Sequence, residues 1–469
     1  MSAPRRLMAG GREHRSSILV AALSSAFGVV LLQVTDALAT MIGADDVSGH
    51  GSVAMALAIV AFVFIAIAVY VGAIVTANTF ATIIAGRTRT IALLRLVGAS
   101  SRTLRRAVAG EGFRVGIVGA AAGALIGTGV SFTVLRISVA RDLIPDLDYA
   151  LVTPVVAAPI VIVVLSTWLA SWVGSHRVLN VQPIQALGAA QELSYDEARH
   201  RPVRNALALC LAALGLAFLA GGVAVGLVSA VGVLIGLIGG LLSFTGLILG
   251  AHRVMPPVLR LAARLTPRSA ASRLAAANAL RYPERSSRAT IGLVIGVTLI
   301  TMFAVAGQSY QDMMHRAQEA QPELYQGVDQ VVAVTVAIFS VLIGFSALIA
   351  AVGMVNNLAL SVLQRTRELG LLRALGFTAT QVRQMILAES AQMTIAAVGL
   401  GLVLGVFYGW AGAQSLLGWQ DGVGLIWPSV PWLLVVACVV GAAALTLVAS
   451  VSPARRATTV SPIVALAAD

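Results

Sequence analysis

A charged motif occurs twice in this chain, 278 residues apart, and this recurrence limits the fold to two copies of one unit. The first copy reads GRTRTIALLRLVGA over residues 86–99, and the second reads QRTRELGLLRALGF over 364–377. Between Arg87 and Glu111 the first copy has seven charged residues, and five of them meet an identical residue in the second copy. Chance alignment of two apolar helices would match Leu, Ala and Val, but seldom five charges. The sequence therefore predicts an internal duplication.

Hydrophobic residues make up 58% of the 469 residues and charged residues only 11%, which is far from the composition of a soluble domain. Several uncharged runs exceed the roughly 20 apolar residues that cross a bilayer core of about 30 Å as a helix. We therefore expect an all-α integral membrane protein with ten transmembrane helices. Their approximate positions are 17–36, 53–85, 107–135, 152–174, 205–227, 229–251, 289–307, 331–362, 384–416 and 431–451.

The ten spans divide into two four-helix repeats of one pattern, joined by a two-helix hairpin and connected by small extracytoplasmic loops. We expect the first repeat over residues 1–190, the hairpin over 191–255 and the second repeat over 256–469. The first repeat ends in the cytoplasm, where the second must also begin. The two intervening spans therefore cross the membrane outward and back again, which returns the chain to the cytoplasm.

The net charge of +12 is distributed along the chain as a membrane topology requires. Basic residues cluster in alternate loops, and residues 253–288 hold eight Arg and one Glu, the strongest cytoplasmic signal. We expect both termini in the cytoplasm and the chain in the inner (plasma) membrane. Residues 1–15 precede an apolar run without a small-residue cleavage site, which is typical of a retained signal anchor. No soluble domain carries a basic face, so we expect no nucleic-acid partner.

All 32 basic residues are Arg, which suggests a bacterium with a GC-rich genome. A Walker-type phosphate loop needs its Lys, so this chain is not expected to be an enzyme that hydrolyses a nucleotide. The six His are scattered, and none lies at metal-ligand spacing from Cys, Asp or Glu. We expect no catalytic residue, cofactor or metal in this chain.

Each copy of the motif predicts a basic helical elbow on the cytoplasmic side. Gly98 and Gly376 suit a helix C-terminus, because glycine adopts the left-handed conformation without a steric penalty. The Ser and Thr residues that follow can cap the next helix by accepting a backbone N–H bond.

Glycines at a spacing of four form a stripe on each span that follows an elbow. The stripes are Gly119, Gly123 and Gly127 in the first repeat and Gly401, Gly405 and Gly409 in the second. Lipid provides no hydrophobic drive for helix pairing, so small residues at this spacing let a second helix approach closely. Helix packing within the subunit is the favoured interpretation, and a subunit or pseudo-dimer interface is the alternative.

These features together resemble a known family. A long span ending in R-x-R-E-[LI]-G-[LI]-L-R-A-[LI]-G is followed by a Gly-rich span, a further span and a terminal P-x-x-A-L. This pattern resembles the FtsX-like permeases, which include the membrane subunits of MacB-type and LolC/LolE-type ABC transporters. The resemblance covers about 284–469 well and about 10–190 more weakly, and the hairpin has no counterpart in the minimal four-span unit.

The resemblance implies two units packed about a pseudo-twofold axis, each elbow resting on one of two copies of a cytoplasmic ABC ATPase that binds ATP and Mg. By that analogy the first ATPase contacts Arg87, Arg89, Leu94, Arg95 and Gly98. The second contacts Arg365, Arg367, Glu368, Leu369, Gly370, Arg373 and Gly376. The Arg and Glu groups would form directional ion pairs, and Leu would fill a groove. The alternative is that these Arg residues anchor the helix at membrane lipid head groups.

The chain departs from the family pattern in two places. Thr90 stands where the second copy has Glu368, so we expect the first half to hold its ATPase differently or more weakly. MacB-type members also carry a large folded domain between their first two spans, whereas here that loop has about 16 to 23 residues. A role across one membrane therefore fits better than docking to an outer-membrane channel.

We expect the permease subunit of an ABC transporter that exports or extracts an amphipathic substrate, such as a lipid, lipopeptide, antimicrobial peptide or hydrophobic drug. A non-transporting subunit that controls an extracytoplasmic cell-wall hydrolase or sensor is the alternative, with residues 308–330 able to hold a small outer partner. An ion-driven carrier is disfavoured because the central turns lack ionisable groups. For Glu111 and Glu389 we favour a head-group position beside a nearby Arg over a lock between elbow and span.

Overall fold

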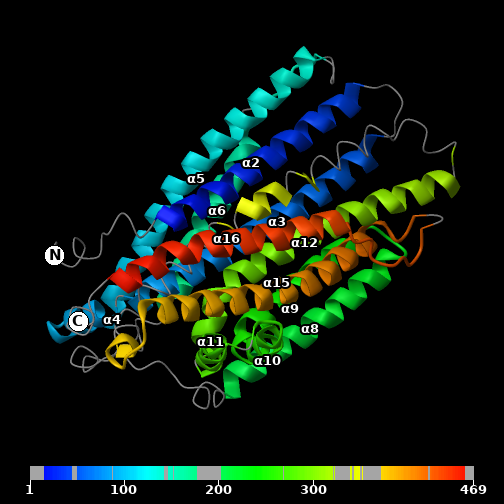
Figure 1. The fold of residues 1–469 in the computed structure, drawn as a ribbon. Helices are drawn as coiled ribbons and strands as arrows, with labels where there is room; N and C mark the ends of the chain where they lie inside the picture. Colours follow the sequence, from blue (N-terminus) through cyan, green and yellow to red (C-terminus); the bar gives the residue numbers. More distant parts are fainter. Residues whose placement is uncertain are drawn as a thin grey trace. The chain divides into compact units, whose positions relative to one another are not determined.

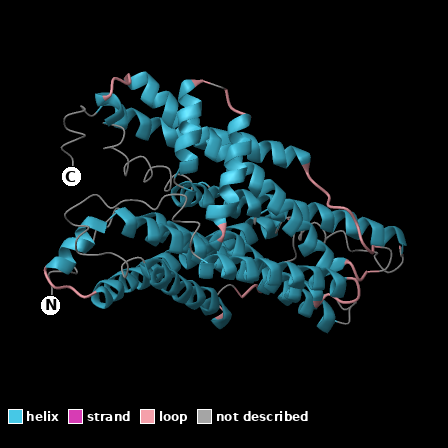
Figure 2. Ribbon diagram, turned by 90° about the horizontal axis from the view of Figure 1, so that it is seen from below, coloured by secondary structure: helices cyan, strands magenta, loops and turns pink. Residues whose placement is uncertain are grey.

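The computed structural model describes residues 15–44, 50–86, 88–141, 146–150, 153–176, 202–267, 269–281, 283–320, 322, 339–340, 343–348, 351, 371–420 and 423–459. All regular structure in these ranges is helical, as Figure 2 shows, so the predicted all-α membrane fold is confirmed. Contacts divide the chain into two units, Met1–Gln191 and Glu192–Asp469.

Four long helices form the first unit, and each is predominantly apolar. They are α2 (Arg15–Ala44), α3 (His50–Gly86), α5 (Ser101–Ala140) and α6 (Ala157–Gly174). Helix α2 packs on α5, α5 on α6, α6 on α3 and α3 on α2, which closes a four-helix bundle (Figure 1). The connections contain a short helix, α4 (Thr88–Leu96), and a 3-10 turn, η1 (Pro154–Val156).

The contact between α2 and α5 is made backbone to backbone. A Cβ atom on Gly127 would lie 2.7 Å from the carbonyl oxygen of Ala26, and one on Gly123 would overlap the carbonyl oxygen of Ala22. The hydroxyl of Ser25 also donates to a carbonyl oxygen of α5 at 2.9 Å. Only glycine permits this approach, which is a common way for helices to associate in lipid.

Helix α15 (Ala379–Leu417) is the centre of the second unit. It packs on both α12 (Pro283–Ala320) and α16 (Trp432–Thr459), the other two long helices that follow the repeat pattern. Four further helices also pack on α15: α8 (Pro202–Gly226), α9 (Gly232–Leu249), α10 (Ala251–Arg264) and α11 (Ala270–Arg281) (Figure 1).

The glycine contact of the first unit recurs in the second. A Cβ atom on Gly405, 278 positions after Gly127, would lie 2.8 Å from the carbonyl oxygen of Thr298. Thr298 is 272 positions after Ala26, and Val294, whose carbonyl oxygen faces Gly401, is likewise 272 positions after Ala22, which faces Gly123. Glycines one turn apart therefore meet equivalent residues in the two helix pairs. This agreement is what an internal duplication predicts.

The hairpin of α8 and α9 belongs to the second unit through its contacts with α15. Within the hairpin the helices touch at glycines, and a Cβ atom on Gly222 would lie 2.5 Å from the amide nitrogen of Gly236. Ser243 on α9 shares a 2.9 Å hydrogen bond with the hydroxyl of Tyr408 on α15. The ring of Phe244 meets the same tyrosine edge-on, with centroids 6.0 Å apart.

The basic stretch 253–288 folds into α10, α11 and the start of α12. On α10 the buried side chains Met255, Leu259 and Ala262 recur at helical spacing, while basic side chains such as Arg260 are exposed. A helix with one apolar face and one basic face is typical of a membrane interface.

Eight helices of the described part are long and apolar enough to cross a membrane, and they match eight of the predicted spans. The span expected at 331–362 lies largely outside the described residues. The last expected span corresponds to α16, whose described apolar part, Trp432–Leu447, is shorter. Helix α12 continues to Ala320, into residues 308–330 that we expected to form an outer loop.

Candidate functional site

Both copies of the charged motif end in the same hydrogen-bonded turn. We call residues 88–100 the first elbow and residues 371–378 the second elbow. Gly98 has φ of 103° and Gly376 has φ of 100°, so both adopt the left-handed conformation expected at a helix C-terminus. In each elbow the amide after the glycine donates to the carbonyl oxygen five residues earlier, at 2.9 Å in the first and 3.1 Å in the second.

The helix that leaves each elbow is capped by a hydroxyl side chain. Ser100 Oγ accepts a hydrogen bond from the amide of Thr103 at 3.2 Å. Thr378 Oγ1 accepts one from the amide of Gln381 at 3.2 Å, and the Gln381 side chain accepts one from the amide of Thr378 at 2.9 Å. The second elbow therefore has a full capping box, and the predicted caps are confirmed in both.

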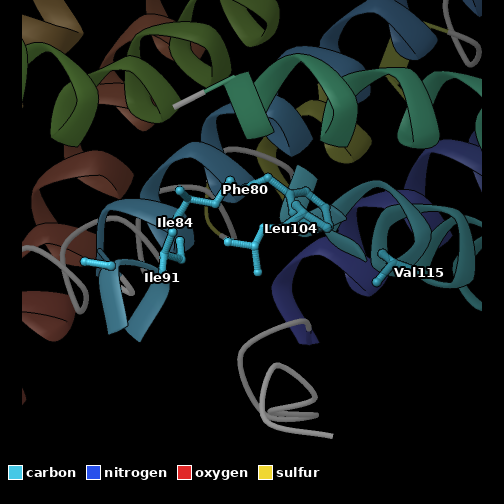
Figure 3. Close-up of a cluster of buried hydrophobic side chains, with 7 residues drawn as sticks. Phe80, Ile84, Ile91, Leu104 and Val115 are labelled. Carbon is cyan, nitrogen blue, oxygen red and sulfur yellow. The ribbon is translucent and has the colours of Figure 1, made fainter. Parts of the chain in front are cut away.

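The inner side of the first elbow is fixed by apolar packing. Ile91 and Ala92 are fully buried and pack with Phe80 of α3 and Leu104 of α5 (Figure 3). Leu94 also packs on this cluster, so its side chain contributes to the contact with α3 and α5. The first elbow is thus held against the two long helices that it connects.

The inner side of the second elbow packs on α15 and α11. Leu372 contacts a buried cluster of Val382, Met385 and Ile386 from the first turns of α15. Ala275 of α11 completes this cluster and is fully buried. Helix α11 is therefore a direct support of the second elbow.

The outer side of each elbow exposes two apolar side chains at equivalent positions. Val97 is 88% exposed and Leu375, 278 positions later, is 71% exposed. Leu93 and Leu371, four residues earlier, are about half-exposed. From the sequence we expected Leu94 at the docking surface and did not predict these four. The signal that could have identified them is an apolar pair at a spacing of four in both copies.

Polar side chains attach α15 to α11 just beyond the second elbow. Glu389 is only 5% exposed, and its carboxylate accepts a 3.3 Å hydrogen bond from the Asn278 side chain. One turn later, Gln392 donates to the hydroxyl of Thr266 and to the carbonyl oxygen of Ser272, both at 3.1 Å. Glu389 is therefore buried under α11, a contact that we did not predict from the sequence, and its head-group depth stays a prediction.

In the first unit, Arg105 connects the start of α5 to the end of α6. Its guanidinium lies 4.2 Å from the ring centroid of Trp172 and donates to the Trp172 carbonyl oxygen at 3.3 Å. A cation is favoured there both by the aromatic ring and by the negative end of the α6 dipole. Arg105 thus helps to hold the first elbow's outgoing helix in place.

The structure describes part of the residue set expected to contact an ATPase. Arg95 and Arg373 are half-buried at equivalent positions, and Arg89 belongs to α4. The remaining members of the set lie outside the described residues: Arg87, Arg365, Arg367, Glu368, Leu369 and Gly370. In the described part, no group of three His, Cys, Asp or Glu side chains could hold a metal ion.

All six stripe glycines are buried in helix contacts within their own unit. Three face α2 and three face α12, and they are Gly119, Gly123, Gly127, Gly401, Gly405 and Gly409. They are therefore part of the scaffold that supports each elbow.

Comparison with known families explains the repeated elbow. The model of the FtsX-like permease C-terminal region matches the chain twice, over residues 62–179 and 340–462. The chain belongs to the FtsX-like permease family. The two matches begin 278 residues apart, which is the interval between the two elbows. Each FtsX-like match contains one elbow, and the α8–α9 hairpin lies between the matches.

The relatives of this FtsX-like permease are named as ABC transporter permeases. It is 32% identical over 145 residues to the uncharacterized ABC transporter permease YknZ of Bacillus subtilis, covering 31% of this chain and 34% of that one. It is 29% identical over 127 residues to the ABC transporter permease YtrF of the same organism, covering 25% of this chain and 29% of YtrF. It is also 31% identical over 147 residues to the macrolide export ATP-binding/permease protein MacB of Rhodopirellula baltica, covering 31% of this chain and 20% of that MacB. The chain spans about a third or less of the length of these relatives.

Proposed function

We propose that this chain is the transmembrane subunit of an ABC transporter, served by two copies of a separate cytoplasmic ATPase that binds ATP and Mg. The observation that carries the proposal is the pair of elbows. Equivalent residues form the same turn and expose the same apolar positions, once in each repeat. Two equivalent docking surfaces in one chain suit a partner that acts as a pair. The names of the permease relatives support the same function.

The exposed apolar pair gives each elbow the chemistry of a docking surface. Burying a Val or Leu side chain in a partner groove stabilises a complex by about 1.5–3 kcal/mol. Arg95 and Arg373 are half-buried between the two exposed residues of their elbows, where a guanidinium can form charge-assisted hydrogen bonds with acidic side chains of a docked partner. The apolar residues would then supply affinity, and the arginines would orient the partner.

The packing behind each elbow provides a route for mechanical coupling. The elbows lead into α5 and α15, which have 40 and 39 residues and are therefore about 60 Å long at 1.5 Å per residue. Displacement of an elbow that is packed against such a helix displaces the helix as well. ATP-driven closure of the two ATPases would thus be transmitted across the membrane.

We propose an amphipathic substrate that is exported or extracted from the membrane, in the class of lipids, lipopeptides, antimicrobial peptides and hydrophobic drugs. The MacB relative is named as a macrolide exporter, which supports export of a hydrophobic compound. The chain is a multi-pass membrane protein, and we place it in the plasma membrane with both termini in the cytoplasm because its basic loops alternate.

The docking proposal is tested by capture of the ATPase from native membranes. A tagged chain and its Val97→Glu, Leu375→Glu double variant are purified from the source cells, and co-purified proteins are identified by mass spectrometry. We expect the native chain to retain an ABC ATPase and the double variant to lose it, because a carboxylate would be buried in an apolar groove. The matched control is Leu265→Glu at an exposed leucine of the second unit outside both elbows, which should retain the ATPase.

Arg373→Ala separates docking from coupling. We expect this variant still to bind the ATPase but no longer to stimulate ATP hydrolysis. Hydrolysis is measured as phosphate release in reconstituted lipid vesicles. An ATPase that binds the double variant as well as the native chain would show that the elbows are not its docking surfaces. A captured ATPase with no movement of labelled lipid or peptide would favour the signalling role over transport.

A further inference from the structure

The connection between α15 and α16 exposes a group of large apolar side chains. Of the six tryptophans in the chain, three lie here, and Trp427 and Trp432 are 91% and 73% exposed. Trp419 is about half-exposed. Leu425 and Val430 are exposed as well, and we call these five residues the tryptophan platform.

The backbone under the platform is held by hydrogen bonds to α15. Gln414 is fully buried, donates to the carbonyl oxygen of Gly424 at 2.6 Å and accepts from the amide of Ile426 at 3.2 Å. The indole of Trp410 donates to the carbonyl oxygen of Ile426 at 2.7 Å. A single side-chain amide thus satisfies two backbone groups of the connection and fixes its conformation.

Apolar packing and a polar contact to α12 fix the rest of the connection. Val423 and Ile426 are buried in a cluster with Met313 of α12 and with α15 side chains. Ser429 donates a hydrogen bond to the carboxylate of Asp312, near the end of α12. The inner side of the connection is therefore packed as a core. This packing holds the backbone in the conformation that exposes the tryptophan side chains.

The length of α16 places the platform at one boundary of the bilayer. Arg455 lies 23 residues after Trp432, a distance of about 35 Å along the helix, which slightly exceeds the roughly 30 Å hydrocarbon core. The arginine end is the cytoplasmic end by the positive-inside rule, so Trp432 lies at the opposite interface. Val436, Val440 and Leu447 continue the exposed apolar surface from Trp432 along the same helix.

Charge also distinguishes this connection from its equivalent in the first unit. Between residues 390 and 454 the sequence has one charged residue, Asp421. The equivalent connection of the first unit, residues 141–153, has four charged residues and no tryptophan. The described residues of this connection therefore carry no charged side chain, unlike most protein docking surfaces, and the sequence of the first connection has no tryptophan that could form an equivalent surface.

We propose that the tryptophan platform is inserted into the boundary between head groups and acyl chains of the outer leaflet, where it fixes the outer ends of α15 and α16 at a set depth. The indole ring suits this layer, because its apolar face enters the acyl region while its N–H stays near water. The occupant of the surface is lipid, and the exposed row on α16 continues the contact into the hydrocarbon core.

The depth of Trp427 is measured by fluorescence of the full chain in phosphatidylcholine vesicles whose acyl chains carry bromine at defined positions. Emission of the Trp427→Phe variant is subtracted from that of the native chain, which isolates the signal of Trp427. This substitution leaves the packing intact because the side chain is almost fully exposed. We expect emission shifted to shorter wavelength than that of indole in water, and the strongest quenching with bromine near the head groups. Bromine near the chain ends should quench less.

Two results would overturn the proposal. Emission at the wavelength of water-exposed indole, with strong quenching by iodide and none by brominated lipid, would place the platform in water. Short-wavelength emission without quenching by brominated lipid would show that protein covers Trp427, as in a self-associated or partner-bound state.

A second variant makes the depth assignment independent of Trp427. The Trp432→Phe difference spectrum should give the same dependence on bromine position, because both indoles belong to one surface. A Trp432 signal quenched most strongly by bromine at the chain ends would contradict a platform lying at the interface.

Discussion

Gly98 and Gly376 lie 278 positions apart and share one backbone conformation, with φ of 103° and 100°. Each ends a helix and starts a turn whose next amide donates to the carbonyl oxygen five residues earlier. Two segments far apart in the chain therefore present their outer side chains with the same local geometry, and one partner type can recognise both.

Replacing either elbow glycine by alanine should destabilise the protein. Neither Gly98 nor Gly376 has an atom within 4 Å of an added Cβ, so the cost comes from the left-handed backbone, about 1–2 kcal/mol. Thermal unfolding in detergent should therefore show a lower midpoint for Gly98→Ala and Gly376→Ala. Gly110→Ala is the matched control, since Gly110 also has open space but lies within α5, where alanine is favoured by about 1 kcal/mol. Equal effects at all three positions would contradict this account.

The Gly127→Ala substitution should separate α2 from α5. The added methyl group would lie 2.7 Å from the carbonyl oxygen of Ala26, so the backbones must move apart, at a cost of about 1–3 kcal/mol. Gly129→Ala in the same helix meets no atom within 4 Å and serves as the control. Resistance to unfolding by a denaturing detergent measures the difference. A Gly127→Ala protein as resistant as the control would show that the contact is not tight.

A double-mutant cycle on Asn278 and Glu389 should reveal direct coupling between α11 and α15. Their hydrogen bond is 3.3 Å long and involves a buried carboxylate, so removing the Asn278 amide should cost about 1–3 kcal/mol. In the Glu389→Ala background, Asn278→Ala should cost measurably less, because its acceptor is already gone. Additive losses in unfolding free energy would mean that the two side chains act separately. If α11 positions the second elbow, Asn278→Ala should also reduce ATPase stimulation.

The Gln414→Leu substitution should loosen the connection between α15 and α16. It leaves the Gly424 carbonyl oxygen and the Ile426 amide without their side-chain partner, at about 1–3 kcal/mol for each buried group. Hydrogen exchange followed by mass spectrometry should show faster exchange at Ile426 than in the native chain. Gln384→Leu, at an exposed glutamine of α15, should leave that rate unchanged. An unchanged rate in Gln414→Leu would mean that other contacts alone hold the connection.

The duplication, the all-helical membrane fold and the elbow geometry were predictable because each depends on local sequence. Charges are rare in this chain, so the recurrence of Arg87 and its neighbours defines the repeat without a structure. A glycine followed within two residues by Ser or Thr specifies both the end of one helix and the cap of the next, as Gly98 and Ser100 show.

The features that the sequence did not predict depend on partners distant in the chain. Glu389 is buried because Asn278, 111 positions earlier, lies on a helix that covers it. The exposure of Val97 and Leu375 depends on which face of a short helix packs inward, and Ile91 and Leu94 are equally apolar. Hydropathy alone ranks all these side chains alike, so only the packing separates the buried residues from the exposed ones.

The glycine contacts also determine where each unit can deform. At Gly127 and Gly405 a carbonyl oxygen of the facing helix occupies the space of a side chain, so no rotamer change can let one helix slide along the other. We therefore expect each of the α2–α5 and α12–α15 pairs to tilt as one body, with little shear between its helices. The compliance needed for a conformational cycle then lies in the short connections, and bending should concentrate at the glycine turns that begin α5 and α15.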